Sequence, residues 1–97
     1  MLRHVATFTW NDTVTPAALE EIVGALLALP GQIPELRAYH LGPDAGLEDG
    51  NADFAIVADF DDVAGWRAYQ ANPAHQAARA LMRPIIASRA AVQHEWS

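Results

Sequence analysis

Residues Trp66–Gln76 read WRAYQANPAHQ, and the pair Asn72-Pro73 in the middle of this segment interrupts a stretch that otherwise looks helical. Asparagine is a good N-cap and proline suits the first helical position, so the pair predicts that one helix ends here and a second begins. Tyr69 and His75 lie on either side of the break. The remaining sequence has to show whether these two side chains belong to a core or to a functional site.

Upstream of the break, two segments alternate between apolar and small or polar residues, which predicts strands. In Leu2–Trp10 the even-numbered residues share one face, and Arg3 and the other odd-numbered residues share the opposite face. Asp53–Phe60 alternates in the same way. Asp61 or Asp62 can then cap the helix that leads to the break.

A helix and a short strand are predicted between these two strands. Thr15 can act as N-cap and Pro16 as first residue of a helix whose apolar repeat continues to Pro30-Gly31. The segment LRAYHLG, Leu36–Gly42, predicts the short strand, and a polar loop follows it. After the break, Pro84 disturbs the end of the third helix, and Ser88–Trp96 alternates again as the last strand.

The predicted order β-α-β-β-α-β, with its second helix broken, is that of a ferredoxin-like α+β fold with a four-stranded antiparallel sheet. Residues 1–97 are expected to form one domain. Both helical segments cover one face of such a sheet and leave the other bare, with Val5, Thr7, Thr9, Ala55 and Val57 on it. Because small uncharged residues on a bare face mark an interface, we expect a homodimer packed sheet against sheet.

Composition excludes several classes of function. The chain has a formal net charge of -6 and no run of basic residues, so no nucleic acid or anionic membrane is expected as partner. It has no cysteine, which excludes disulfides and thiol chemistry. The first residues lack the apolar run of a signal peptide and no segment resembles a membrane span, so a cytoplasmic location is expected.

Metal sites are not expected either. The four histidines, His4, His40, His75 and His94, show no close helical spacing typical of a ligand motif. The acidic segment LEDGNAD, Leu47–Asp53, lacks the full ligand pattern of a calcium loop and is expected to be solvated.

Five segments together resemble the stress-responsive A/B barrel (Dabb) family of dimeric α+β barrels over essentially the whole chain. They are RHVATFTW (Arg3–Trp10), Gly42, ADFAIVADFDD (Ala52–Asp62), YQANPAHQ (Tyr69–Gln76) and SRAAVQHEW (Ser88–Trp96). YQANPAHQ is the most specific, because it is similar to the family's Tyr-x-x-x-Pro-x-His segment. The family more often has an acidic residue where this chain has His94.

The resemblance implies a cofactor-free site. In a plant polyketide cyclase of the family, the residue matching His75 acts as general base, the one matching Tyr69 assists it, and the one matching His4 lines the pocket. The remaining residues expected to line a ligand pocket are Ala6, Phe8, Leu26, Phe54 and Ala78. The cyclase carries bulky aromatic or histidine residues in place of Leu26, Phe54 and Ala78, so a differently shaped cavity is expected here.

The residues themselves support one chemical role for His75. In the first turn of a helix, the positive end of the helix dipole and partial burial both keep an imidazole neutral. A neutral imidazole can remove a proton from a carbon between two carbonyls without any cofactor. A structural reading stays open, in which His75 caps its own helix and Tyr69 is a core aromatic.

Three functions therefore remain at this point. The first is a homodimer that binds a small apolar oxygenated molecule, with or without cyclase-like catalysis. The second is a non-enzymatic stress-response protein whose assembly is its function. The third is a cofactor-free monooxygenase of the antibiotic-biosynthesis type.

Overall fold

The computed structural model describes residues 1–97 and has the predicted order of elements. The elements are β1 (Leu2–Trp10), α1 (Pro16–Leu27), the 3-10 turn η1 (Leu29–Gly31), β2 (Ala38–Pro43), β3 (Phe54–Phe60), α2 (Val63–Ala71), α3 (Pro73–Met82), the 3-10 turn η2 (Arg83–Ile85) and β4 (Ile86–Glu95). The ferredoxin-like α+β fold with a broken second helix is thus confirmed.

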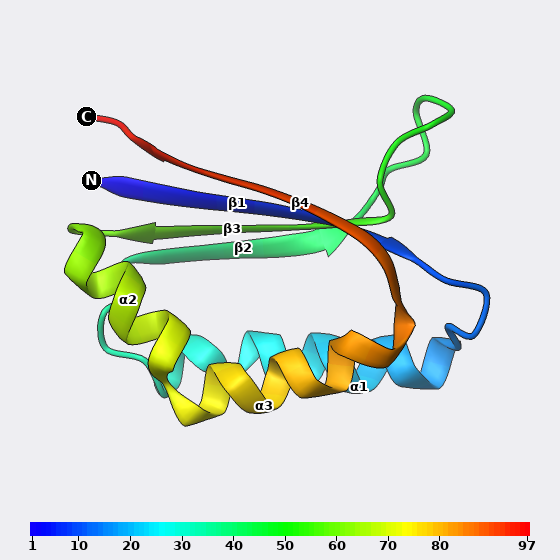
Figure 1. Cartoon of the computed structure of the whole chain (residues 1–97), viewed down its shortest axis with the longest axis horizontal. Coiled ribbons are helices and arrows are strands. Elements are labelled where there is room, and N and C mark those ends of the chain that lie inside the picture. The colour runs from blue at the N-terminus through cyan, green and yellow to red at the C-terminus, as the bar shows by residue number, and fades with distance from the viewer.

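The four strands form one antiparallel sheet in the order β2-β3-β1-β4. All three helices lie on one side of this sheet, and the loop between β2 and β3 projects to the other side (Figure 1). None of the helices combines the length and the apolar character needed to span a bilayer.

Side-chain caps set the helix starts where the sequence placed them. The Thr15 hydroxyl accepts a hydrogen bond from the backbone N–H of Ala18, with an N–O distance of 3.1 Å. Asp62, not Asp61, caps α2, because its carboxylate accepts from Gly65 N–H at 2.9 Å. Each cap satisfies a backbone donor that the first turn of a helix leaves free.

Several strand boundaries differ from the prediction by one or two residues, and the starts of the second and last strands differ most. The second strand begins at Ala38, not Leu36, because its pairing with β3 starts with Ala38 opposite Asp59. The last strand begins at Ile86, not Ser88, since Ile86 pairs with Trp10 beyond a register shift in β1. Pairing therefore continues almost to Pro84.

The alternation of β1 separates a buried face from a bare one. Leu2, His4, Ala6 and Phe8 are buried beneath the helices, whereas the odd-numbered residues between them are half-buried on the side without helices. β3 follows the same rule, with Phe54, Ile56, Ala58 and Phe60 buried. One core thus fills the space between sheet and helices.

The strand register arranges the bare face in three rows across the sheet. The central rows are His40–Val57–Val5–Val92 and Gly42–Ala55–Thr7–Ala90, and the outer row is Ala38–Asp59–Arg3–His94. Apolar and small residues therefore dominate the middle of this face, and polar residues gather toward one end of it.

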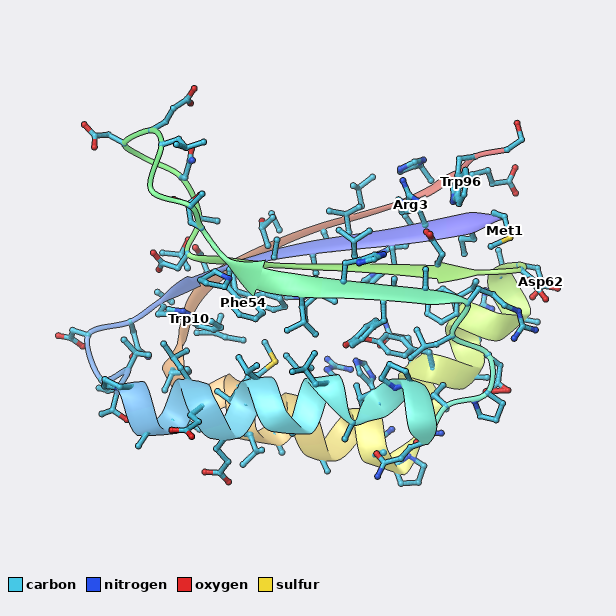
Figure 2. The ribbon with its side chains drawn as sticks, turned by 180° about the vertical axis from the view of Figure 1, so that it is seen from behind. Met1, Arg3, Trp10, Phe54, Asp62 and Trp96 are labelled. Atoms are coloured by element: carbon cyan, nitrogen blue, oxygen red, sulfur yellow. The ribbon has the colours of Figure 1, made fainter.

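The outer row contains an ion pair that the sequence did not predict. Arg3 donates twice to Asp59, from Nε at 2.8 Å and from Nη2 at 2.9 Å. The guanidinium also lies 4.4 Å from the centre of the Trp96 ring, on the side of the sheet opposite the helices (Figure 2). These hydrogen bonds from Arg3 hold the pKa of Asp59 below its ordinary value.

Candidate functional site

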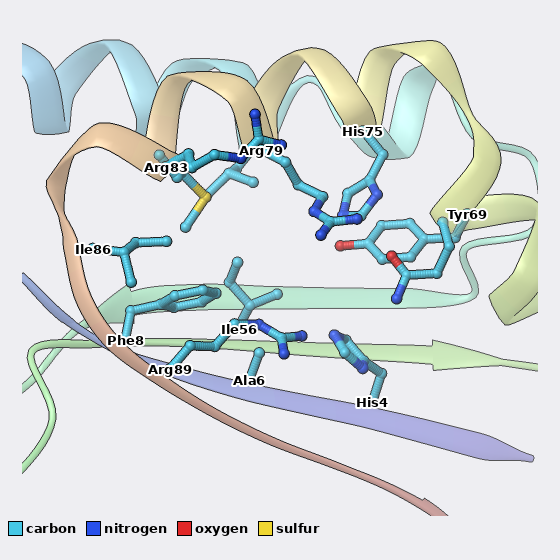
Figure 3. A pocket seen from close by; sticks show the side chains of 13 residues that line it. His4, Ala6, Phe8, Ile56, Tyr69, His75, Arg79, Arg83, Ile86 and Arg89 are labelled. Carbon is cyan, nitrogen blue, oxygen red and sulfur yellow. The ribbon is translucent and has the colours of Figure 1, made fainter.

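A cavity of about 160 Å³ lies between the sheet and the helices. Figure 3 shows how its walls come from elements far apart in the chain. The lining residues are His4, Ala6 and Phe8 of β1, Leu26 of α1, Ile56 of β3, Tyr69 and Gln70 of α2, His75, Arg79 and Met82 of α3, Arg83 of η2, and Ile86 and Arg89 of β4. This volume is comparable to the apolar cavity of about 150 Å³ known to hold benzene.

His75 reaches this cavity from the first turn of α3. Asn72 caps that helix by accepting a hydrogen bond from Ala74 N–H at 2.9 Å, and Pro73 is its first residue. The imidazole is buried, and its Nδ1 has no hydrogen-bond partner in the protein. The His75 ring lies against that of Tyr69, with 3.9 Å between centroids and 33° between planes.

Burial lowers the pKa of His75 to about 4, and the positive charge of Arg79 adds to this effect. The backbone of Gln70 raises the pKa of His75, whereas His4 and Arg89 lower it further. His75 is therefore neutral at pH 7 and can accept a proton.

Tyr69 shares a hydrogen bond with a second tyrosine. The two hydroxyl oxygens of Tyr39 and Tyr69 lie 3.2 Å apart. Burial raises the pKa of both phenols above the ordinary value, so both carry their proton at neutral pH. One phenol can therefore donate to the other, which leaves the second O–H free to donate elsewhere.

Sequence reasoning did not single out Tyr39 as part of this site. The only signal in the sequence was its alternation with His40 and Leu41, which places Tyr39 and Leu41 on the helix side of β2. Its hydrogen bond with Tyr69 depends on where α2 packs against the sheet, which the local sequence does not show.

His4 faces the same cavity from β1 and is buried. The Gln93 side-chain amide on β4 lies 2.8 Å from Nδ1 of His4. The atom in contact is the amide nitrogen, which can only donate, so Nδ1 is the acceptor and neutral His4 carries its proton on Nε2. Burial lowers the pKa of His4, and the Arg89 charge lowers it further.

The cavity is also lined by three arginines, Arg79, Arg83 and Arg89, which the sequence analysis did not anticipate. They come from α3, η2 and β4, and no acidic residue lines the cavity with them. The two ion pairs of the chain involve other arginines, Arg3 and Arg37. No run of basic residues exists in the sequence, yet the fold gathers half of its six basic residues here.

The structure brings together six of the eight side chains expected at the site: His4, Ala6, Phe8, Leu26, Tyr69 and His75. Phe54 and Ala78 are buried in the adjoining core and do not line the cavity. Phe54 instead packs against Trp10, with 5.7 Å between ring centroids. No three histidine, aspartate or glutamate side chains gather where they could hold a metal ion.

The model of the stress responsive A/B barrel domain matches residues 2–95. The chain belongs to this family. The family resemblance expected from the sequence is thereby confirmed, and the match spans the segment that carries Tyr69 and His75.

Two relatives agree with this assignment. An uncharacterised protein of Streptomyces coelicolor is 36% identical over 85 residues, which cover 86% of this chain and 88% of that protein. The stress-response A/B barrel domain-containing protein HS1 of Arabidopsis thaliana is 26% identical over 76 residues, covering 76% of this chain and 70% of its own.

A solved structure is also very similar. A dimeric ferredoxin-like protein of unknown function from Thermobifida fusca superposes with a TM-score of 0.92 at 53% identity, over 98% of this chain and 90% of that one.

Two enzymes share the fold alone. One is a hydroxynitrile lyase from Passiflora edulis, with a TM-score of 0.86 and 15% identity over 99% of this chain and 93% of that one. The other is SnoaB, a cofactor-independent oxygenase from Streptomyces nogalater, with a TM-score of 0.77 and 17% identity over 99% of this chain and 92% of that one.

Proposed function

We propose that this protein is a homodimer that binds a small, largely apolar oxygenated molecule between sheet and helices, where His75 acts as a cofactor-free general base. The observation that carries the proposal is the buried, neutral imidazole of His75, whose Nδ1 has no partner in the protein and whose ring packs on Tyr69 at the cavity wall. A buried polar group without a partner is costly, so it indicates a site for something else.

The lining fits a small ring with oxygen substituents. Phe8, Leu26, Ile56 and Met82 offer apolar contact, and the histidines and Tyr69 offer hydrogen bonds from the other side. A few polar groups converging on an apolar pocket are typical of small-molecule sites.

The proposed chemistry is proton transfer followed by ring closure. His75 takes a proton from a carbon between two carbonyls, and the electron pair of the broken C–H bond forms an enolate. Tyr69 donates a hydrogen bond to the enolate oxygen, while Tyr39 donates to the Tyr69 oxygen. The enolate carbon then attacks a second carbonyl carbon, and the new alkoxide takes up the proton that His75 removed, which restores the neutral imidazole.

Binding and proton transfer can be tested separately. Benzoylacetone is expected to raise the melting temperature of the wild type by mass action. Ala6→Leu, which fills the cavity floor, should abolish that rise while the variant still folds. An unchanged rise in Ala6→Leu would place the ligand elsewhere.

Deuterium exchange into ethyl acetoacetate, followed by NMR in dilute buffer, tests the base. The wild type should accelerate exchange, and His75→Ala should lose about 10²–10⁴ of that acceleration. Tyr69→Phe should lose less, since it removes a hydrogen bond and leaves the proton acceptor in place. Gln76→Ala is the matched control, because Gln76 is the exposed neighbour of His75 on α3.

Each other reading predicts a different result. Binding without accelerated exchange would contradict the base and leave a non-enzymatic binding protein. Oxygen consumption with a dihydroxyarene in place of exchange would favour the monooxygenase. Loss of stability by about 1 kcal/mol or more in His75→Ala, with binding and exchange unchanged, would make His75 structural.

A further inference from the structure

Resting on the proposed function of the same cavity, we infer that its ligand carries a carboxylate, which Arg79 and Arg89 hold from opposite walls. The cavity is a local excess of positive charge in a chain whose formal net charge is -6. Arg79, Arg83 and Arg89 all line it, and none of the twelve acidic residues does.

The two arginines approach the cavity from different layers. Arg79 extends from α3 on the helix side and Arg89 from β4 in the sheet, and both side chains point into the space between these elements (Figure 3). Neither guanidinium has a carboxylate partner in the chain. Two unpaired positive charges directed at one space repel each other, and an anion between them removes that cost.

A carboxylate fits this arrangement better than a neutral group. The planar guanidinium matches a carboxylate in two parallel hydrogen bonds, which are charge-assisted and stronger than neutral ones. Both arginines are exposed in the single chain, so the acid group would lie at the cavity mouth. The ring would then extend inward toward Phe8, Leu26 and Ile56.

The same anion would alter the base. The charged groups that face His75 are the arginines Arg79 on α3 and Arg89 on β4, while His4 on β1 is neutral at pH 7 and neutral Tyr69 of α2 lies beside the His75 ring. The charges of Arg79 and Arg89 help to depress the pKa of His75. A carboxylate between the two arginines offsets those charges, so binding of the acid should make His75 a stronger base than it is in the empty cavity.

The experiment compares two probes of equal size, 2,4-dihydroxybenzoate and its uncharged amide, 2,4-dihydroxybenzamide, by calorimetric titration at low salt. The acid is expected to bind at least about tenfold more tightly than the amide, because its hydrogen bonds to the guanidinium groups are charge-assisted. That advantage should shrink as salt rises, because the interaction lies at an exposed mouth.

Variants locate the interaction. Arg79→Gln and Arg89→Gln should each remove most of the acid's advantage while leaving the affinity for the amide unchanged. Arg67→Gln is the matched control, since Arg67 is an exposed arginine of α2 that does not line the cavity. Circular dichroism confirms that each variant is folded. NMR titration should show the pKa of His75 rising with the acid and not with the amide.

Failure of this inference can be told apart from failure of the proposed function. Equal binding of acid and amide, or an advantage that survives in both Gln variants, would overturn the carboxylate assignment and leave the cavity as a binding site. Absence of binding by either probe would overturn the carboxylate assignment, whereas the exchange assay with ethyl acetoacetate reads the base role of His75 independently.

Discussion

The imidazole of His75 lies against the Tyr69 ring, near two guanidinium groups and without a carboxylate to stabilise its charged form. Its neutral state is thus a result of burial and of neighbouring positive charge. Such a base differs from a histidine oriented by an aspartate, because its strength depends on what enters the cavity.

Acid should destabilise the protein through this residue. His75 titrates near its ordinary value of 6.5 in the unfolded chain and at about 4 in the folded one. Between these pH values the unfolded chain binds more protons than the folded one. The contribution of neutral His75 to the free energy of unfolding is therefore complete above pH 6.5 and is lost as pH falls toward 4. The loss is on the order of 3 kcal/mol, and urea unfolding at a series of pH values measures it.

A His75→Gln variant should flatten the stability profile in this window. His4 retains a smaller slope of the same sign, since its pKa is also lowered. His94→Gln, at an exposed site of β4, is the control and should keep the wild-type slope. A His75→Gln profile as steep as the wild type would contradict the lowered pKa.

At the scale of single residues, the sequence predicted the site residues that lie in one local segment. It missed those that only folding brings to the cavity. Tyr69 and His75 were found because a single helix break lies between them. Tyr39 and Tyr69 are 30 positions apart, so their hydrogen bond could not be predicted from local pattern. Arg79 and Arg89 were missed because exposed arginines on a helix and on an edge strand carry no pattern of their own.

The break between α2 and α3 is the element that positions His75. Asn72 has extended backbone angles, with φ -65° and ψ 129°, and its side chain caps α3 while its own N–H donates to Tyr69 O at 3.3 Å. The break thus connects the last turn that holds Tyr69 with the first turn that holds His75. In a continuous helix, the side chains of Tyr69 and His75 would have a different relative orientation.

Asn72→Ala should therefore affect both stability and the site. Loss of the cap is expected to cost about 1 kcal/mol of unfolding free energy. Benzoylacetone binding should weaken as well, because the first turn that carries His75 loosens. Thermal unfolding with and without the ligand measures both effects. Asn72→Asp keeps a capping oxygen and should restore most of the stability and most of the benzoylacetone binding. If Asn72→Asp restored neither, the cap would not be the cause of the losses in Asn72→Ala.

Helix starts were predictable because their chemistry is local: Thr15, Asp62 and Asn72 each bond an N–H two or three residues further on. Strand starts were less so. The beginning of β4 depends on Trp10, 76 positions before Ile86 in the chain, and that of β2 on Asp59, the partner of Ala38 in β3.

At the scale of the whole molecule, the bare face of the sheet is the surface that we propose to be the dimer interface. Val57, Val5 and Val92 form a continuous row across three strands, and Val92 is 54% exposed in the single chain. The Arg3–Asp59 pair lies beside this row. In a sheet-to-sheet dimer, apolar burial would favour association and the ion pairs would favour one relative orientation.

Val57→Lys should disrupt this dimer, because a lysine in an apolar interface has no partner for its charge. We expect the dissociation constant to rise on the order of 100-fold or more, measured by analytical ultracentrifugation. Ala77→Lys, on the exposed side of α3, is the control and should not change it. A wild type that sediments as a monomer at micromolar concentration would refute the dimer itself.

The sheet order also has a consequence for how the chain acquires its structure. β1 precedes the other elements of this domain along the chain, yet one of its two neighbours is β4, and Leu2 pairs with Glu95, 93 positions later. During synthesis β1 can pair with β3 once residue 60 has left the ribosome, but its other edge stays open until β4 follows. Pairings so distant in sequence slow folding because loop closure must precede them. The nascent chain therefore carries an unpaired edge on β1 until its longest strand pairing, the one with β4, can form, and this edge is a surface on which chaperones would act.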